Sequence, residues 1–102
     1  MSIKEILESI GLPCAYSHFD GNDAPQEPPF LAYLGAGQSR FLADDTIYHK
    51  TNRYQIEYYF KNKSAATEER IENILLSNGF IYEKSEDVYI DSEDCFVIYY
   101  TI

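Results

Sequence analysis

Two cysteines and two histidines are the residues of this sequence best suited to nucleophilic or metal chemistry. Cys14 and His18 are four positions apart, and a thiol beside an imidazole is one way to activate a cysteine nucleophile. Pro13 and the turn formers after His18 argue against a helix here, so this spacing does not bring the two side chains together. His49 has no second histidine or cysteine at zinc-ligand spacing. We therefore expect no catalytic residue and no metal ligand in this group.

Acidic residues and glycines offer weaker motifs. Asp44 and Asp45 could form half of a carboxylate pair for acid–base catalysis, but no partner nucleophile accompanies them, and loop capping is the simpler interpretation. Residues 83–94 hold six acidic residues and one lysine, but the run lacks the central glycine of a calcium-binding EF-hand loop. Residues 35–37, Gly-Ala-Gly, are not followed by the Lys-Ser or Lys-Thr of a phosphate-binding loop. The sequence therefore predicts no enzyme activity and no cofactor.

The length and charge of the chain limit what it can bind. Its 102 residues are expected to form one domain, spanning residues 1–102. Eight Lys and Arg residues against 17 Asp and Glu residues give a net charge of −9. This acidic excess is spread evenly over the two halves of the chain, which predicts no basic arm or stripe. Direct, sequence-specific nucleic-acid binding needs such a surface and is not expected.

Membrane and export signals are also missing from the sequence. No apolar run approaches the roughly 20 residues that a membrane-spanning helix needs. The apolar positions of the N-terminal segment are interrupted by Lys4, Glu5 and Glu8, so we do not expect a signal peptide. Without an export signal, Cys14 and Cys95 are expected to stay reduced. We therefore predict neither a membrane partner nor a disulfide.

Two segments carry the signals of amphipathic helices. Ser2 and Glu5 predict a capping box for a helix of about ten residues that ends at Gly11. Ser64 predicts the start of a second helix, which ends at Gly79. The stripe of the second helix that faces the core is expected to hold four residues: Ile71, Ile74, Leu75 and Asn78.

The segments between and after the helices predict strands. Residues 13–29 hold all four prolines of the chain and predict a long extended connection, followed by a first strand at 30–34. Residues 35–39 predict a flexible loop. Residues 46–60 predict either an antiparallel hairpin or one long strand with a kink near Asn52.

The remaining β segments are less regular. Residues 40–45 fit either a short edge segment or a part of the preceding loop. Residues 80–102 predict two or three strands. The last of these, within residues 94–102, carries apolar groups on both faces and is expected to be central in the sheet.

This order of elements predicts the fold class. The predicted order along the chain is a helix, two to three strands, a second helix and two to three further strands. Short links between consecutive strands favour antiparallel pairing. We therefore predict a two-layer α+β domain, in which an antiparallel sheet of four to six strands packs with two helices. At least the second helix is expected to cover one face of the sheet.

Ten tyrosines and six phenylalanines make the chain rich in aromatic residues. A sheet covered on one face only cannot bury all of them. Aromatic residues on the open face either form cross-strand ladders or anchor a subunit interface. The aromatic candidates for such an interface are Tyr33, Phe41, Tyr48, Tyr59 and Tyr99.

Short motifs in a fixed order along nearly the whole chain carry a family resemblance. They are Gly11-Leu12-Pro13, Ala15-Tyr16, His18-Phe19, Pro28-Pro29-Phe30 with Tyr33, Ala43-Asp44-Asp45, Tyr48 with Lys50, Ile56-Glu57-Tyr58-Tyr59 before Lys61, Glu83-Lys84-Ser85-Glu86 ahead of Tyr89-Ile90, and Glu93 before the closing strand. In this pattern the chain resembles a family of small proteins from tailed bacteriophages and Gram-positive prophages. These are the tail-terminator, head–tail joining or tail-completion proteins of long-tailed phages.

The resemblance implies an architectural function in virion assembly. Proteins of this kind cap the tail tube and help join it to the head as subunits of a ring, often a hexamer. The implied partners are further copies of the chain, tail-tube proteins and head-connector proteins. The implied location is the cytoplasm of the bacterial host during assembly, and then the tail or head–tail junction of the virion.

The resemblance also implies roles for two loops and for the acidic charge. Residues 20–29 and 35–45 would reach along the ring axis or into its lumen, which adds Asp44 and Asp45 to the candidate interface. A channel crossed by DNA gains from acidic walls, because they do not bind the phosphates.

A small acidic protein-binding or inhibitory module, which mimics the charge of DNA, is the alternative. It would need acidic groups arranged like phosphates on one exposed face, and the even spread of charge argues against this.

Overall fold

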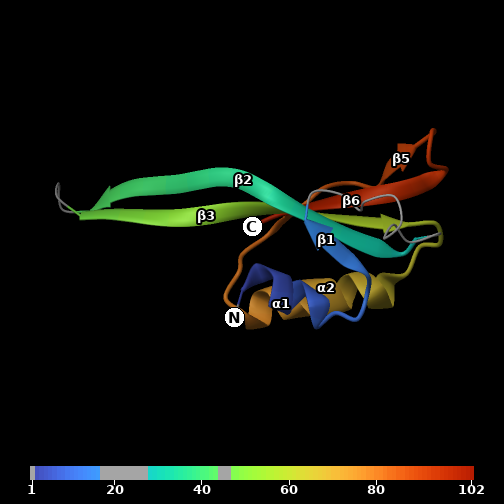
Figure 1. Cartoon of the computed structure of the whole chain (residues 1–102), viewed down its shortest axis with the longest axis horizontal. Coiled ribbons are helices and arrows are strands. Elements are labelled where there is room, and N and C mark those ends of the chain that lie inside the picture. Colours follow the sequence, from blue (N-terminus) through green and yellow to red (C-terminus); the bar gives the residue numbers. More distant parts are fainter. Residues whose placement is uncertain (1, 17–27, 44–46) are drawn as a thin grey trace.

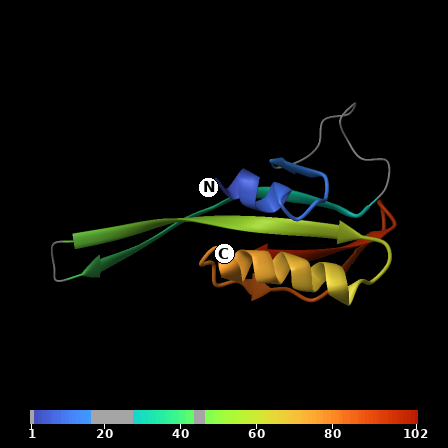
Figure 2. The same ribbon diagram turned by 90° about the horizontal axis from the view of Figure 1, so that it is seen from below.

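The computed structural model describes residues 2–16, 28–43 and 47–102, and gives residues 37–52 within these ranges by their backbone alone. Two helices lie on one face of a six-stranded sheet, and a pair of long strands extends well beyond them (Figures 1 and 2). The principal dimensions are 50 × 28 × 26 Å, so the molecule is elongated. None of the helices in these ranges is long and apolar enough to cross a membrane.

The first helix, α1 (Ile3–Glu8), begins with the predicted capping box. The Ser2 hydroxyl accepts a hydrogen bond from the Glu5 amide at 3.2 Å, and the Glu5 carboxylate accepts one from the Ser2 amide at 3.4 Å. The regular helix is shorter than the ten residues predicted, because the next amides bond three residues back instead of four. Gly11 then adopts the left-handed conformation, with φ +95°, as expected of a helix end.

The second helix, α2 (Ala65–Ser77), also follows its sequence signals. The Ser64 hydroxyl accepts from the Thr67 amide at 3.2 Å, and Gly79 beyond the helix end has φ +86°. Ile71 and Leu75 are fully buried, as predicted for the inner stripe. The prediction for Asn78 is wrong, since this residue is exposed and its side chain donates to the Ile74 carbonyl at 2.8 Å. The helix has ended at this point, so Asn78 caps it.

The sheet has the order β1-β2-β3-β6-β4, and β5 pairs with the same edge of β6 further along. Its strands are β1 (Cys14–Tyr16), β2 (Phe30–Ala43), β3 (Ile47–Phe60), β4 (Glu83–Lys84), β5 (Val88–Ile90) and β6 (Cys95–Thr101). The sheet thus has six strands, within the predicted range. Strand β6 lies inside the sheet, with Val97 and Ile98 fully buried on its two faces, which confirms its central position.

The prediction of an entirely antiparallel sheet is wrong at one pair. Strand β1 runs parallel to β2, with Cys14 opposite Leu31 and Tyr16 opposite Tyr33. The chain between β1 and β2 is long enough to return to the same end of the sheet, as a parallel pair requires. The sheet is therefore mixed, in an α+β domain.

The interpretation of residues 35–39 as a flexible loop is also wrong. Strand β2 continues through this segment, and β3 is one long strand, which decides between the two alternatives for residues 46–60. A β-bulge lies where the glycines fall, because the register shifts between Gly35 and Gln38. Residues 40–43 consequently belong to a strand and not to a loop.

The core lies between the two helices and the sheet. Leu7 and Ile10 come from the first helical segment, Ile71 and Leu75 from α2, and all four are fully buried. The Arg70 guanidinium joins the helices by donating to the Ile10 carbonyl. The sheet contributes alternate residues to the same cluster: Leu31, Tyr33, Ile56, Tyr58, Phe60, Ile98 and Tyr100.

Candidate functional site

Strands β2 and β3 continue far past the rest of the sheet. Residues 38–43 of β2 pair with residues 47–52 of β3, and we call this two-stranded ribbon the arm and the remaining described residues the body. The pairing of β3 with β6 stops at Gln55, apart from a backbone hydrogen-bonded pair between Tyr54 and Ile102. Figures 1 and 2 show the arm projecting from the body, with neither described helix beside it.

The arm leaves the body at the bulge in β2. Gly35 lies opposite Tyr54 and Gln38 opposite Asn52, so two residues of β2 face the single residue Arg53 of β3. A bulge bends a strand and increases its local twist. The glycine-containing segment therefore sets the direction of the arm while the strand pairing continues on both sides.

Two of the predicted interface residues lie in the arm. Phe41 is opposite His49 in the register, and Tyr48 is opposite Leu42. Asp44 and Asp45 fall outside the described residues. The structure thus places Phe41 and Tyr48 in one projecting element.

Tyr59 and Tyr99 lie on the opposite face of the sheet from the helices. In the register of β3 and β6, Glu57 is opposite Tyr99 and Tyr59 is opposite Val97. Because alternate residues of a strand share a face, Tyr59 and Tyr99 are diagonal neighbours on the same face of the sheet. The Tyr59 hydroxyl donates to Glu57 Oε1 at 2.7 Å, and its ring stacks on Phe30 with 4.7 Å between centroids. Burial and the adjacent Glu57 carboxylate raise the pKa of Tyr59, which keeps the phenol protonated. This pair forms a second candidate surface, separate from the arm.

Tyr33 belongs to the core. Its side chain faces the helices, is 7 % exposed and packs edge-on against Tyr16 with 5.3 Å between ring centroids. Burial in the core therefore accounts for Tyr33, and we do not include it in a docking surface.

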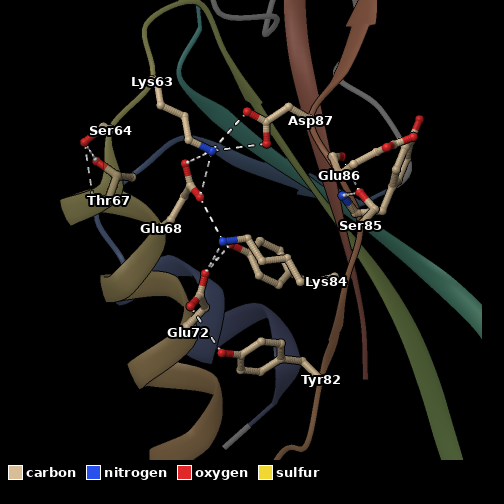
Figure 3. Close-up of polar contacts among 12 residues, drawn as sticks. Lys63, Ser64, Thr67, Glu68, Glu72, Tyr82, Lys84, Ser85, Glu86 and Asp87 are labelled. Atoms are coloured by element: carbon tan, nitrogen blue, oxygen red, sulfur yellow. Dashed lines mark hydrogen bonds and ion pairs between the residues drawn. The ribbon is translucent and has the colours of Figure 1, made fainter.

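A cluster of charged residues between α2 and the β4 edge was not predicted from the sequence (Figure 3). Glu68 lies at its centre, with a side chain only 6 % exposed. Lys84 Nζ is 2.9 Å from Glu68 Oε1, and Lys63 Nζ is 2.9 Å from Glu68 Oε2. Lys63 also reaches Asp87 at 3.0 Å, and Lys84 reaches Glu72 at 2.9 Å.

Two tyrosines complete the cluster at Glu72. The Tyr82 hydroxyl donates to Glu72 Oε1 at 3.2 Å, and the Tyr100 hydroxyl donates to Oε2 at 2.8 Å. The Lys84 ammonium also lies over the Tyr100 ring, 5.9 Å from its centroid. The cluster thus connects one face of α2 to both β4 and β6.

The charges of this cluster stabilise one another. Burial by itself raises the pKa of Glu68, but hydrogen bonds from Lys84 and Lys63 outweigh it and hold the pKa below 4.5. Burial likewise opposes ionisation of Glu72, yet Lys84 and Tyr100 lower its pKa. The hydrogen bond to Glu68 raises the pKa of Lys84. All these groups are ionised at neutral pH, so the cluster anchors α2 and supplies no proton donor or acceptor poised for catalysis.

One signal in the sequence pointed to this cluster. Glu68 and Glu72 are four positions apart, and Glu68 precedes the buried Ile71 by three, which places both carboxylates beside the inner stripe of α2. From the sequence alone, the attraction between Glu68 and the positive end of the helix dipole accounts for this residue. The partner Lys84 is distant in sequence, and only the fold brings it near.

The residues considered for nucleophilic or metal chemistry do not assemble into a site in the part of the chain that the structure describes. Burial raises the pKa of the Cys14 thiol to about 11, which keeps it protonated at neutral pH. His18 falls outside the described residues, and His49 lies on the arm. The described residues hold no group of three or more His, Cys, Asp or Glu side chains that could bind a metal ion.

The chain matches no protein-family model, and no curated protein matches it at a significant level.

Proposed function

We propose that this protein is a structural subunit of a long-tailed phage virion, which caps the tail tube and helps join the tail to the head. In this proposal several copies form a closed ring, with six as the expected number. The partners are neighbouring copies, the tail tube and the head connector. Assembly takes place in the cytoplasm of the bacterial host, and the protein remains at the tail or head–tail junction.

The arm is the observation that carries this proposal. A two-stranded ribbon without other support is marginally stable in water, and its outer edges leave backbone amides and carbonyls unpaired. The arm has no third strand in the described ranges, although the body that supports it has a well-packed core. Contact with a neighbouring subunit would cover the arm, and a head-to-tail contact whose rotation closes generates a ring.

The net charge of −9 supports the same function. In this function DNA crosses the channel of the ring, and an acidic wall does not bind its phosphates. We expect part of the acidic surface to line the bore. A ring with a basic inner wall would contradict this placement.

The experiment is to examine the purified chain by analytical ultracentrifugation and negative-stain electron microscopy, alone and with purified tail tubes. We expect closed rings, in solution at high concentration or at one end of the tubes. A matched control is the chain in which a two-residue Asn-Gly turn replaces residues 37–52, because Ala36 and Arg53 then flank a short hairpin loop. A protein that stays monomeric and does not bind the ends of tail tubes would contradict the proposal.

An acidic protein-binding or inhibitory module remains the alternative. The acidic residues of the segment 83–94 favour it, since Asp91 and Glu93 are exposed in the turn that follows β5, and Figure 1 shows β5 at the opposite end of the molecule from the arm. Such a module would stay monomeric until its target is added and would then form a complex of fixed stoichiometry. The same ultracentrifugation experiment separates the two functions.

A further inference from the structure

Strands β4 and β5 together form one outer edge of the sheet. Both run antiparallel to β6, and no strand of the described chain lies on their other side. An open edge of this kind presents unpaired backbone amides and carbonyls, to which a strand of another chain can add. Whether another chain can pair here therefore depends on how the backbone of this edge is arranged.

The edge contains one extra residue. In the register, Lys84 is opposite Tyr100 and Val88 is opposite Val97. The three residues 85–87 therefore face only two residues of β6. An extra residue of this kind is a β-bulge, which bends the strand and interrupts its pairing. We call residues 85–87 the edge bulge.

The side chain of Ser85 replaces a backbone group in the pairing with β6. In a regular antiparallel pair, two opposite residues exchange two hydrogen bonds between their amides and carbonyls. The Ser85 amide donates to the Tyr99 carbonyl at 2.9 Å, but the Tyr99 amide donates to Ser85 Oγ, also at 2.9 Å. The Ser85 hydroxyl in turn donates to the Glu86 carbonyl at 2.8 Å. The hydroxyl therefore supplies the acceptor that a backbone carbonyl supplies in a regular pair.

The edge bulge also changes which backbone groups point outward. Backbone groups of successive strand residues point to alternate sides. Lys84 directly precedes the residue that bonds to β6, so its amide and carbonyl point away from the sheet. Val97 lies two positions before Tyr99 and therefore bonds on the same side of β6. Its partner Val88 bonds inward, which makes Tyr89 the outward residue of β5.

The two outward residues do not have the spacing of a regular strand. Lys84 and Tyr89 are five positions apart, whereas the outward groups of a regular strand recur every two positions. An incoming strand that pairs with one of them is out of register with the other. Neither β4 nor β5 alone offers more than a short segment for pairing, since they contain two and three residues.

Ion pairs hold the edge bulge in place from both sides (Figure 3). Asp87 within the bulge lies 3.0 Å from Lys63 Nζ. Lys84, just before the bulge, lies 2.9 Å from both Glu68 and Glu72 of α2. Charged side chains and bulges are two of the means by which sheet edges avoid pairing with other chains. This edge has both.

We propose that Ser85 and the edge bulge close the β4–β5 edge to strand addition by another chain. Neither a second copy of this protein nor an extended peptide can continue the sheet at this edge. The inference does not depend on the proposed function. If copies of the chain form a ring, their contacts use other surfaces and leave this edge free.

Removal of the extra residue tests this inference. The variant Ser85→Val with Glu86 deleted, which we call the opened variant, gives both strands equal numbers of residues and removes the hydroxyl acceptor. β4 and β5 can then join into one regular edge strand. We expect the opened variant to self-associate about tenfold more tightly than the wild type in sedimentation equilibrium, the gain from one or two additional net hydrogen bonds.

A matched control makes the same kind of change outside the pairing with β6. Ser92→Val with Glu93→Gln also exchanges a serine for valine and removes one carboxylate, in the exposed turn after β5. This control should associate as the wild type does. Far-UV circular dichroism and urea denaturation report whether both variants are folded. A folded opened variant that associates no more tightly than the control would contradict the proposal.

Amide hydrogen exchange tests the same edge in the wild type, without any substitution. The Tyr99 amide should be protected, because it donates to Ser85 Oγ. The outward amides of Lys84 and Tyr89 should exchange rapidly at every protein concentration. Protection of these two amides that increases with concentration would show that another chain pairs with the edge, and would overturn the inference.

The outcomes separate this inference from the proposed function. Rings in which the amides of Lys84 and Tyr89 stay unprotected support both. Rings in which these amides are protected support the proposed function and overturn the closed edge. A wild type that stays monomeric, with an opened variant that associates, contradicts the proposed function and supports the closed edge.

Discussion

Strands β2 and β3 pass through two regions of the molecule that differ in what covers them. In the body, alternate side chains of both strands are buried under α1 and α2, and β6 continues the sheet beside β3. In the arm, the same two strands have only each other as neighbours among the described elements. One pair of strands therefore serves as part of a stable core at one end and as a projecting element at the other.

The body and the arm also differ in the contacts that stabilise them. The body is stabilised by apolar packing and by the Glu68 ion cluster, which connects α2 to the β4 edge of the sheet. The arm has backbone pairing between its two strands, but no described helix or third strand packs against it. We infer that the body folds without help from the arm, whereas the arm gains its full stability only in the assembly.

The largest effect on folding is expected from a core leucine. Leu75→Ala removes a fully buried side chain of α2 and should lower the free energy of unfolding by about 2–5 kcal/mol in urea denaturation. The matched change in the arm, Leu42→Ala, should lower the unfolding free energy of the monomer by less than about 1 kcal/mol, because no helix or third strand of the described chain covers the arm. Equal losses at the two sites would mean that the arm and the body share one core.

A smaller effect is expected from the ion cluster. Glu68→Gln removes the shared partner of Lys63 and Lys84 and should cost about 1.5–3 kcal/mol, the range for hydrogen bonds to charged groups. Glu69→Gln, on an exposed position of the same helix, is the control and should leave stability unchanged. Equal unfolding midpoints in urea for the two variants would show that the cluster adds no stability.

The pH dependence of stability follows from the same cluster. Because the pKa values of Glu68 and Glu72 are lowered from 4.5 on folding, their contribution is complete above pH 4.5 and is lost as the pH falls through the folded values. The pKa values of Lys63 and Lys84 are raised from 10.5, so their contribution is complete below that pH and is lost as the pH rises through the folded values. We expect a flat neutral plateau in wild-type unfolding free energy and a shallower acid limb in Glu68→Gln.

The smallest effect is expected at a helix end in the body. Gly79 has φ +86°, which costs other residues about 1 kcal/mol, and an added Cβ would meet no atom within 4 Å. Gly79→Ala should therefore lower the unfolding free energy by about 1 kcal/mol without changing the fold. Gly11→Ala should cost more, because its Cβ would lie 3.2 Å from Arg70 Nη2 in addition to the strained φ of +95°.

Local signals in the sequence predicted the body well. The capping box at Ser2 and Glu5, the cap at Ser64, and the glycine ends of both helices depend on neighbouring residues only, and the structure confirms each. The central position of β6 followed from its apolar residues on both faces. The α+β class followed from the same patterns, which limited the number of strands to between four and six.

The features that the sequence did not predict depend on contacts between distant residues. Glycines at 35 and 37 predicted a loop, but pairing with β3 keeps the strand continuous through a bulge. The parallel pairing of β1 depends on the path of a long connection, which no local pattern specifies.

The most direct test of the central claim compares the full chain with the chain in which Asn-Gly replaces residues 37–52. Chemical denaturation and sedimentation equilibrium are measured on both proteins under one set of conditions. If the body is self-sufficient and the arm serves assembly, the shortened chain keeps the unfolding free energy of the full-length monomer to within about 1 kcal/mol and no longer self-associates. A shortened chain that fails to fold, or that assembles as well as the full chain, would contradict this account.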